Sequence, residues 1–270
     1  MAGVWRIGRV LLGALAGLSF ALMLLPIVFV SWLSFFKNEL LAFPPEGYTL
    51  RWFPQISAQS QFAQGFATSL EVAVMAMLGG LVLGIPASLA LARHAFRGRD
   101  ATMTLLTAPL IVPSIVIGTA LYIFFIEVEI ATGWPLAGSL VGLALAHILI
   151  TIPWTVRLIT ASLVGLDPAL AEAAMSLGAN RWRTLMRVTL PVIRPAVVAA
   201  GLFAFVVSFG NLEISLFLVA PGVTTLPIAI LQYLEWKIDP TIAAVSLVQI
   251  AIIAVGMLLT NRIVRLSQVV

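Results

Sequence analysis

Six long apolar stretches constrain this chain more than any other feature of its sequence. A bilayer core of about 30 Å is crossed by about 20 residues of α-helix. Stretches of suitable length cover residues 10–36, 66–91, 102–126, 136–159, 192–220 and 241–259. Hydrophobic residues make up 61% of the chain and charged residues only 10%, which excludes an ordinary water-soluble fold. The sequence therefore predicts an all-α membrane protein, one domain over residues 1–270, with six spans.

The basic residues predict the orientation of these spans. An even number of spans places both termini on one side of the membrane. If the connecting segments alternate, 12 of the 15 basic residues fall on the side of the termini, and only Lys37, Arg51 and Lys237 fall on the other. Because cytoplasmic loops carry an excess of Lys and Arg, both termini are predicted to be cytoplasmic. The first stretch stays apolar through residue 36 and has no Ala-x-Ala-type cleavage site at its end, so it is predicted to be a retained span.

The segment of residues 160–191 is the longest of the predicted cytoplasmic links. Asp167 and Pro168 are typical of a helix N-cap and a first helical residue, and strong helix formers follow them. Gly178 can end that helix, since glycine adopts the left-handed conformation. Asn180 can cap a second short helix. The link is thus predicted to form a helix, a turn and a helix at the inner face of the membrane.

Two roles for this helical link remain open on its spacing alone. Its apolar side can dock into a groove of a partner protein. Alternatively, the link can lie in the headgroup layer with Arg181, Arg183 and Arg187 facing lipid phosphates. A DNA-reading role is disfavoured, because membrane spans close the unit at both ends. No nucleic-acid partner is therefore expected. Pro191 is predicted to separate the second short helix from the next span.

A few prolines and polar residues within the spans are candidates for a transport path. Pro109 and Pro113 lie four residues apart on one helix face and predict either ordinary kinks or a bend of the third span around a pathway. Glu71 and Glu213 lie at a similar predicted depth, where an unpaired charge is costly. Each is either a hydrogen-bonded structural carboxyl or a group that attracts a cation; Asn211 is a weaker candidate.

Several catalytic chemistries are excluded by what the sequence lacks. The two lysines are not in a phosphate-binding loop, so the chain is not expected to hydrolyse ATP. There is no cysteine, and His94 and His147 do not form a metal-binding pattern. No aspartate lies in a predicted span, which disfavours an intramembrane protease, and His147 is better explained by a hydrogen bond between helices. A self-contained secondary carrier remains the alternative, although we find no internal repeat.

One motif in the 160–191 link resembles a known family. Glu172-Ala173-Ala174, followed after three residues by Gly178 and later by Val188-Thr189-Leu190-Pro191, is similar to the "EAA" loop of bacterial ABC importer permeases. Val188 stands where the family prefers isoleucine. The resemblance implies a type I importer fold of six spans, in which the loop is a coupling helix. It assigns docking on a cytoplasmic ATPase to Glu172, Ala173, Ala174 and Gly178, with Leu190 and Pro191 completing the motif.

Further segments extend the resemblance over nearly the whole chain. Residues 43–48, 208–218 and 224–227 are similar to spermidine/putrescine-type permeases, which implies a polyamine or a similar small organic solute as substrate. Gly210 and Asn211 stand where polyamine-type members tend to carry acidic residues. The resemblance also implies the partners: an ATPase dimer that binds ATP and Mg, a second permease that is identical or related, and a periplasmic binding protein. The expected location is the bacterial inner membrane, and no cofactor is expected on this chain itself.

Overall fold

The computed structural model of the chain describes residues 2–39 and 43–263, so both chain ends lie outside the described residues. Within that part there is no β-strand, and six helical segments are long and apolar enough to cross a membrane. They are α1 (Ala2–Leu33), α3 (Ser60–Arg93), α5 (Ser114–Thr132), α6 (Leu140–Val164), the segment Arg181–Phe209 and α12 (Thr241–Ile263). The prediction of an all-α membrane protein with six spans is confirmed.

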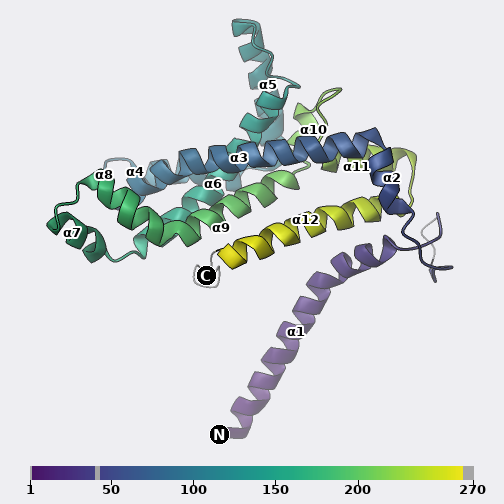
Figure 1. Cartoon of the computed structure of the whole chain (residues 1–270), viewed down its shortest axis with the longest axis horizontal. Helices are drawn as coiled ribbons and strands as arrows, with labels where there is room; N and C mark the ends of the chain where they lie inside the picture. Colours follow the sequence, from purple (N-terminus) through teal and green to yellow (C-terminus); the bar gives the residue numbers. More distant parts are fainter. Residues whose placement is uncertain (1, 40–42, 264–270) are drawn as a thin grey trace. The chain divides into compact units, whose positions relative to one another are not determined.

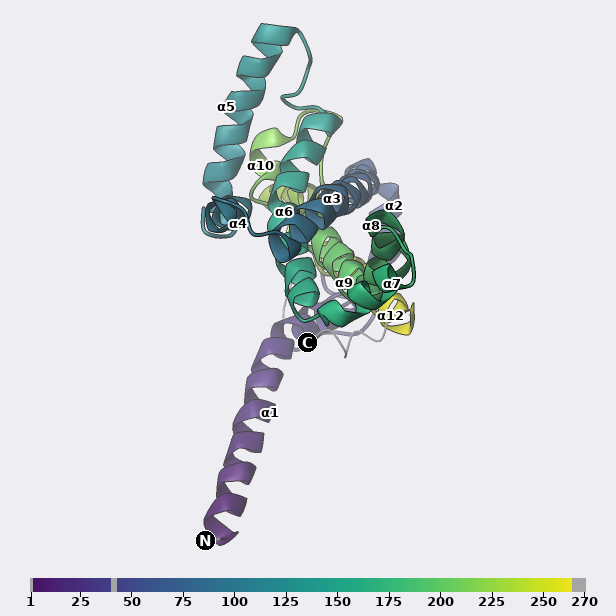
Figure 2. The same cartoon turned by 90° about the vertical axis from the view of Figure 1, so that its left-hand side faces the viewer.

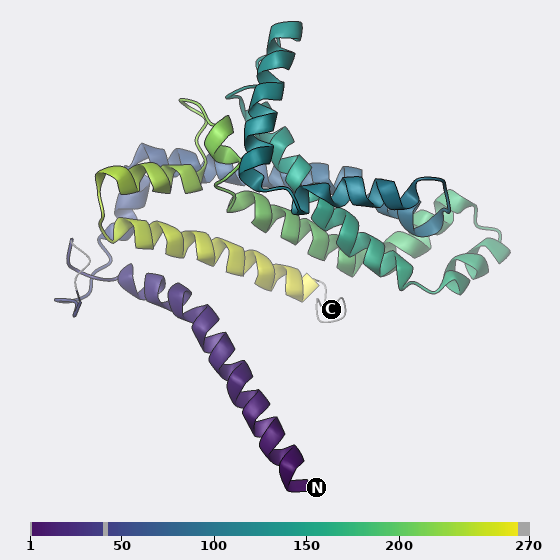
Figure 3. The same cartoon turned by 180° about the vertical axis from the view of Figure 1, so that it is seen from behind.

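The chain divides into two compact units, and the second of them carries the candidate functional residues. The first comprises Met1–Phe62 and Ile230–Ile252, and the second Ala63–Ala229 and Ile253–Val270. In the second unit, α3, α6 and α9 (Leu190–Phe209) run alongside one another, with α7 (Pro168–Ser176) and α8 (Arg181–Thr184) at one end (Figures 1 and 3).

Small residues allow α3 and α6 to approach closely. A Cβ atom added at Gly84 of α3 would lie 2.3 Å from the hydroxyl oxygen of Thr155 in α6, so only glycine fits there. The Thr155 hydroxyl donates to the carbonyl of Gly80 at 3.1 Å, and the Thr151 hydroxyl donates to the carbonyl of Ala76, also at 3.1 Å. Such small-residue contacts and interhelical hydrogen bonds stabilise helix pairs where no hydrophobic driving force acts between helices.

The predicted third span, residues 102–126, is wrong as a single helix. The helix α4 (Arg99–Thr107) passes into a 3₁₀ turn, η1 (Ala108–Leu110), and α5 starts only at Ser114. Pro113 explains the interruption, because it has no N–H to donate and its ψ of 131° is extended. The predicted bend is thus a complete break. The helix long enough to cross the membrane is α5, and α5 projects away from α3, α6 and α9 (Figure 2).

The prediction that Pro191 separates the second cytoplasmic helix from the next span is also wrong. The helix runs on from α8 through a π-helical turn, η2 (Leu185–Thr189), into α9. A proline inside an α-helix clashes with the carbonyl four residues earlier. The wider π turn lies directly before Pro191 and gives the backbone a place to accommodate it. A single helical segment, Arg181–Phe209, therefore connects the link of residues 160–191 with the fifth span.

The fifth span starts and ends earlier than the predicted range of residues 192–220. The helix α9 ends at Phe209, and a short helix, α10 (Ser215–Leu218), follows after an irregular segment. Another helix that the sequence analysis did not predict, α11 (Leu226–Trp236), comes before α12. The backbone N–H of Leu226 donates to the Ser69 hydroxyl of α3 at 2.8 Å, which fixes the start of α11 on the second unit.

In the first unit, a buried carboxylate joins the end of α11 to the start of α12. Asp239 accepts hydrogen bonds from the Tyr233 hydroxyl and the Thr241 backbone N–H, each at 2.9 Å, and pairs with Lys237 at 2.9 Å. Burial disfavours the charged carboxylate, but the hydrogen bonds from Lys237, Thr241 and Tyr233 outweigh it and hold the pKa of Asp239 below its ordinary value. The carboxylate is therefore charged at neutral pH and connects the two helices.

Candidate functional site

The link of residues 160–191 folds through local hydrogen bonds, as its sequence predicted. The Asp167 side chain accepts from the backbone N–H of Ala169 at 2.9 Å, and Pro168 is the first residue of α7. Gly178 has a φ of +88°, which only glycine adopts without strain. Asn180 caps α8 by accepting from the N–H of Arg183 at 2.8 Å. These contacts connect residues close in sequence, so they form without help from the rest of the fold.

The exposed side of α7 and of the following turn carries the four residues that the resemblance assigns to docking. Glu172, Ala173 and Gly178 are exposed, and Ala174 is half-buried. Next to them, several large apolar side chains have no covering in the described structure. These are Leu170 (45% exposed), Met175 (44%), Leu177 (90%) and Trp182 (66%). An exposed apolar surface on a helical projection is typical of a docking site.

The other two motif residues lie in a different setting. Leu190 and Pro191 begin α9, and Leu190 packs against the cluster of buried residues that α6 and α9 share, which includes Ile159 and Ile193. Leu190 therefore packs the start of α9, the helix that follows the link, against α6. The motif thus combines an exposed part, Glu172 to Gly178, with the packed Leu190, whereas Pro191 is itself exposed.

A second feature is a cavity of about 600 Å³ at the break between α4 and α5. One wall is the interrupted segment itself, residues 109–115, and the opposite wall comes from α6, the end of α9 and the residues that follow it. The side chains of Ile150 and Trp154 project from α6, and Trp154 stacks on Phe203 of α9 at 5.7 Å between ring centroids. Asn211 and Glu213 complete the lining.

Glu213 is not in a helical span, which corrects the prediction that it lies within the fifth span. It sits in the irregular segment between α9 and α10, exposed on the cavity wall. Asn211 shapes this segment: its side-chain oxygen accepts from the N–H of Ile214 at 3.0 Å, and its carbonyl accepts from the Ser215 hydroxyl at 2.9 Å. Within the described residues, the Glu213 carboxylate has no hydrogen bond or ion pair.

His147 fixes the irregular segment to α6. Its two ring nitrogens lie 2.7 Å from the Ser208 hydroxyl of α9 and 3.1 Å from the Ser215 hydroxyl of α10. The His147 side chain is 1% exposed, and it does not line the cavity. The preferred prediction for this residue, a hydrogen bond between helices, is confirmed. Through Ser215 and Asn211, His147 positions the segment that carries Glu213.

The structure does not bring Glu71 into this cavity. Glu71 is exposed on α3 and is not among the residues that line the cavity beside Glu213. The sequence analysis missed Trp154 entirely. No local pattern marks it, because Trp154 lies inside the continuous helix α6 and its place on the cavity wall depends on which helices face each other. A role for Glu71, Asn211 and Glu213 in transport stays a prediction.

The chain resembles known transport proteins along most of its length. Residues 80–268 match the family described as "Binding-protein-dependent transport system inner membrane component". The putrescine transport system permease protein PotI of Escherichia coli (strain K12) is 30% identical over 243 residues, which cover 90% of this chain and 84% of PotI. The spermidine/putrescine transport system permease protein PotC of Escherichia coli (strain K12) is 26% identical over 260 residues, 96% of each chain.

A solved structure has the same fold. A chain of a bacterial ABC transporter involved in the import of the acidic polysaccharide alginate superposes with a TM-score of 0.71, covering 95% of this chain and 96% of the other. The sequence identity is 14%, so the likeness concerns the fold alone.

Fold, motif and relatives together define a permease subunit of an ABC importer. The chain belongs to the family of binding-protein-dependent transport system inner membrane components. Its location in the inner membrane follows from that family, and the relatives are transport permeases rather than enzymes. The alternative of a self-contained secondary carrier receives no support from these comparisons.

Proposed function

We propose that this permease passes a small organic cation of the polyamine class through the cavity at the α4–α5 break. The observation that carries the proposal is the Glu213 carboxylate, which is exposed on the wall of a cavity of about 600 Å³. The names of the relatives PotI and PotC, which refer to putrescine and spermidine, support this substrate class.

The lining of the cavity suits the chemistry of such a substrate. A primary ammonium group can pair with the Glu213 carboxylate and donate to the amide oxygen of Asn211. The ring of Trp154 offers a face to a cation, an interaction of about 0.5–2 kcal/mol. Ile150 and Val207 provide apolar contacts for the methylene groups between two ammonium groups. Each contact is weak enough to allow release, as transport requires.

Uptake of radiolabelled putrescine by the assembled transporter tests this proposal. Glu213→Gln nearly preserves shape and removes only the charge, so uptake is expected to fall about tenfold, the cost of one charge-assisted hydrogen bond. Glu71→Gln asks whether the second carboxylate belongs to the path. Glu127→Gln is the matched control, since Glu127 is exposed near the end of α5 and does not line the cavity.

Thermal stability in detergent is measured on the same preparations. Loss of uptake only in parallel with loss of the folded complex would remove Glu213 from the path. An equal loss of uptake in Glu127→Gln would also remove Glu213 from the path. If the wild type takes up no putrescine while its ATP hydrolysis still responds to a binding protein, the substrate class is wrong and the permease assignment stands.

The exposed part of the link is proposed to dock on a cytoplasmic ATPase. Support comes from the uncovered apolar side chains around α7, including Leu177 and Trp182. The proposed assembly contains an ATPase dimer, which binds ATP and Mg²⁺, a second permease and a periplasmic binding protein. The continuous helix Arg181–Phe209 would transmit movement of α7 over about 40 Å, at 1.5 Å per residue, toward the segment that carries Glu213.

This arrangement requires the link and both termini to face the cytoplasm. The native chain has no cysteine, so single cysteines report accessibility directly. A cysteine at Ala179, in the turn before α8, is expected to be protected from a membrane-impermeant thiol reagent in intact cells. A cysteine at Gly133, after the end of α5, is expected to be labelled. Labelling at Ala179 from outside would overturn both the orientation and the docking proposal.

A further inference from the structure

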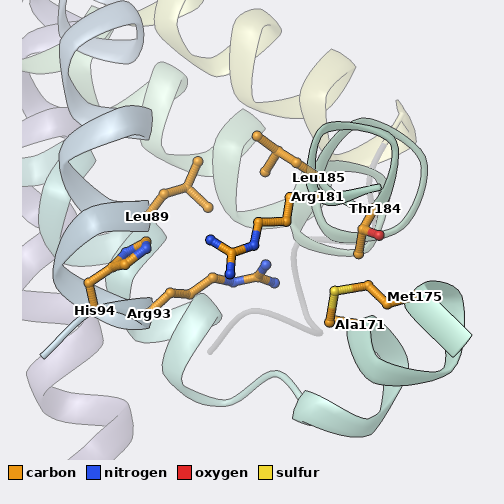
Figure 4. Close-up of a pocket in the computed structure, with 8 residues that line it drawn as sticks. All are labelled: Leu89, Arg93, His94, Ala171, Met175, Arg181, Thr184 and Leu185. Carbon is orange, nitrogen blue, oxygen red and sulfur yellow. The ribbon is translucent and has the colours of Figure 1, made fainter. Parts of the chain in front are cut away.

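A second cavity lies beside the docking link, between the link and the end of α3. It has a volume of about 470 Å³. Figure 4 shows the residues that line it: Leu89, Arg93 and His94 at the end of α3, and Ala171, Met175, Arg181, Thr184 and Leu185 from α7, α8 and η2. The cavity is distinct from the one beside Glu213, because the two share no lining residue.

Two arginine side chains from different elements converge on this space. Figure 4 shows the guanidinium groups of Arg93 and Arg181 directed into the cavity. Arg93 is held in place, because its Nη2 donates to the buried Thr189 hydroxyl at 2.7 Å. The ion pairs in the described part of the chain, Arg51–Glu39 and Lys237–Asp239, include neither of these arginines. Two like charges therefore share one cavity, and no carboxylate among the described residues pairs with either of them.

A third polar group lines the same cavity. Thr184 is 3% exposed, and its hydroxyl oxygen is buried without a hydrogen-bond partner among the described residues. A buried hydroxyl without a partner costs about 1–3 kcal/mol. The rest of the lining consists of His94 and the apolar residues Leu89, Ala171, Met175 and Leu185. Two guanidinium groups and a hydroxyl are the donors that a tetrahedral oxyanion prefers.

We infer that this cavity binds a phosphate group between Arg93 and Arg181. The phosphate comes either from the headgroup of an anionic lipid or from soluble phosphate. Binding would join the end of α3 to α8 and so hold the docking link against the spans. The inference goes beyond the proposed transport function and does not depend on the substrate. Positive charge near the membrane surface attracts any anionic lipid, so a built site must be distinguished from diffuse attraction.

The test compares the thermal stability of the assembled transporter in nanodiscs of phosphatidylcholine alone and of phosphatidylcholine mixed with phosphatidylglycerol. A third sample contains phosphatidylcholine and inorganic phosphate. Native mass spectrometry of the wild type counts retained phosphatidylglycerol and needs no variant. Stabilisation by phosphatidylglycerol alone identifies the lipid headgroup as the source, and stabilisation by inorganic phosphate identifies the soluble ion. If neither anion stabilises the wild type and no lipid is retained, the inference is overturned.

Variants separate the site from general attraction. Arg181→Gln and Arg93→Gln are each expected to weaken anion binding about tenfold, the loss of one charge-assisted contact. Arg183→Gln is the matched control, because Arg183 is exposed on the same short helix and does not line the cavity. Equal weakening in Arg183→Gln would show diffuse attraction and overturn the inference. A third outcome is that Arg181→Gln loses ATPase binding while neither phosphatidylglycerol nor phosphate stabilises the wild type. A carboxylate of the ATPase would then occupy the cavity, and the inference of a phosphate site would be overturned.

Discussion

The link of residues 160–191 and the cavity at the α4–α5 break are built in opposite ways. Asp167 and Asn180 cap α7 and α8 through backbone groups only two or three residues away. The cavity instead depends on partners far apart in sequence, since His147 reaches Ser208 and Ser215 across 61 and 68 residues. The link is therefore encoded locally, whereas the cavity exists only once the helices have assembled.

This difference predicts which properties a substitution in each region should change. A local defect in the link should leave the spans folded and uncouple them from the ATPase. A defect in the contacts around the cavity should lower stability and transport together. Four substitutions, described from the largest expected effect on uptake to the smallest, test this contrast.

Gly178→Pro should have the largest effect on transport. Proline fixes φ near −65°, against the +88° of Gly178. It also removes the N–H that donates to the Met175 carbonyl at 2.9 Å. A mismatch of about 3 kcal/mol corresponds to roughly a hundredfold loss, so putrescine uptake and ATPase association should fall to background. Nothing packs within 4 Å of a Cβ at Gly178, so insertion and detergent stability should remain normal.

Gly133→Pro is the matched control for this substitution. Gly133 also has a positive φ, +73°, open space around its Cβ position and an N–H that donates to the Glu129 carbonyl at 2.8 Å. The same local defect at the end of α5 should leave ATPase association intact. Normal uptake in Gly178→Pro, or an equal loss of ATPase in Gly133→Pro, would contradict a specific role of the link.

His147→Ala should weaken the cavity by loosening its support. The substitution leaves the Ser208 hydroxyl buried without its partner, which costs about 1–3 kcal/mol of folding stability, while the Ser215 hydroxyl keeps its hydrogen bond to the Asn211 carbonyl. Uptake is expected to fall about tenfold, and the melting temperature of the complex should fall with it. His147→Gln, which keeps a donor and an acceptor, should recover part of both. Lost uptake at an unchanged melting temperature would place His147 on the path itself.

The link was predictable from sequence because its signals are local. Asp167 and Pro168 start a helix, and Gly178 ends it through the left-handed conformation that no other residue adopts freely. The six spans were predictable for a similar reason, since apolar length alone decides whether a helix can cross a bilayer. These features required no knowledge of which helices lie together.

The sequence alone did not predict which prolines interrupt a helix. Pro153 and Pro195 lie inside continuous helices, Pro191 follows a π turn, and Pro113 breaks the chain between α4 and α5. The residue type is the same in each case, so the outcome depends on the packing that re-satisfies the backbone. The same limit explains why Glu213 was placed in a helix and why Trp154 was missed, because both depend on where α9 ends and which helices face each other.

Trp154→Leu should reduce putrescine uptake about fivefold, if the ring contributes about 1 kcal/mol of cation–π attraction on the cavity wall. Trp154→Phe keeps an aromatic face and should lose less. The measurement is the concentration dependence of uptake, and the expected change is a higher KM. Trp134→Leu is the control, since Trp134 is 71% exposed between α5 and α6 and does not line the cavity. An equal change in that control would remove Trp154 from the path.

Asp167→Ala should have the smallest effect on uptake, and it isolates the local encoding of the link. The substitution removes the acceptor for the Ala169 N–H, and loss of an N-cap costs about 1 kcal/mol. Because α7 has only nine residues and none of them is buried, this cost should appear as local opening of α7. Amide hydrogen exchange in α7 is expected to accelerate about fivefold.

Asp167→Asn separates capping from charge, since asparagine caps as well as aspartate but carries no charge. We expect its exchange rates in α7 to match the wild type, because the hydrogen bond to Ala169 is kept. Docking on the ATPase can re-order α7, so uptake in Asp167→Ala should fall less than about twofold. Exchange in α3 and α6 should not change in either variant. If Asp167→Asn accelerates exchange as much as Asp167→Ala, the carboxylate charge rather than the cap stabilises α7, and the link is not governed by local hydrogen bonding alone.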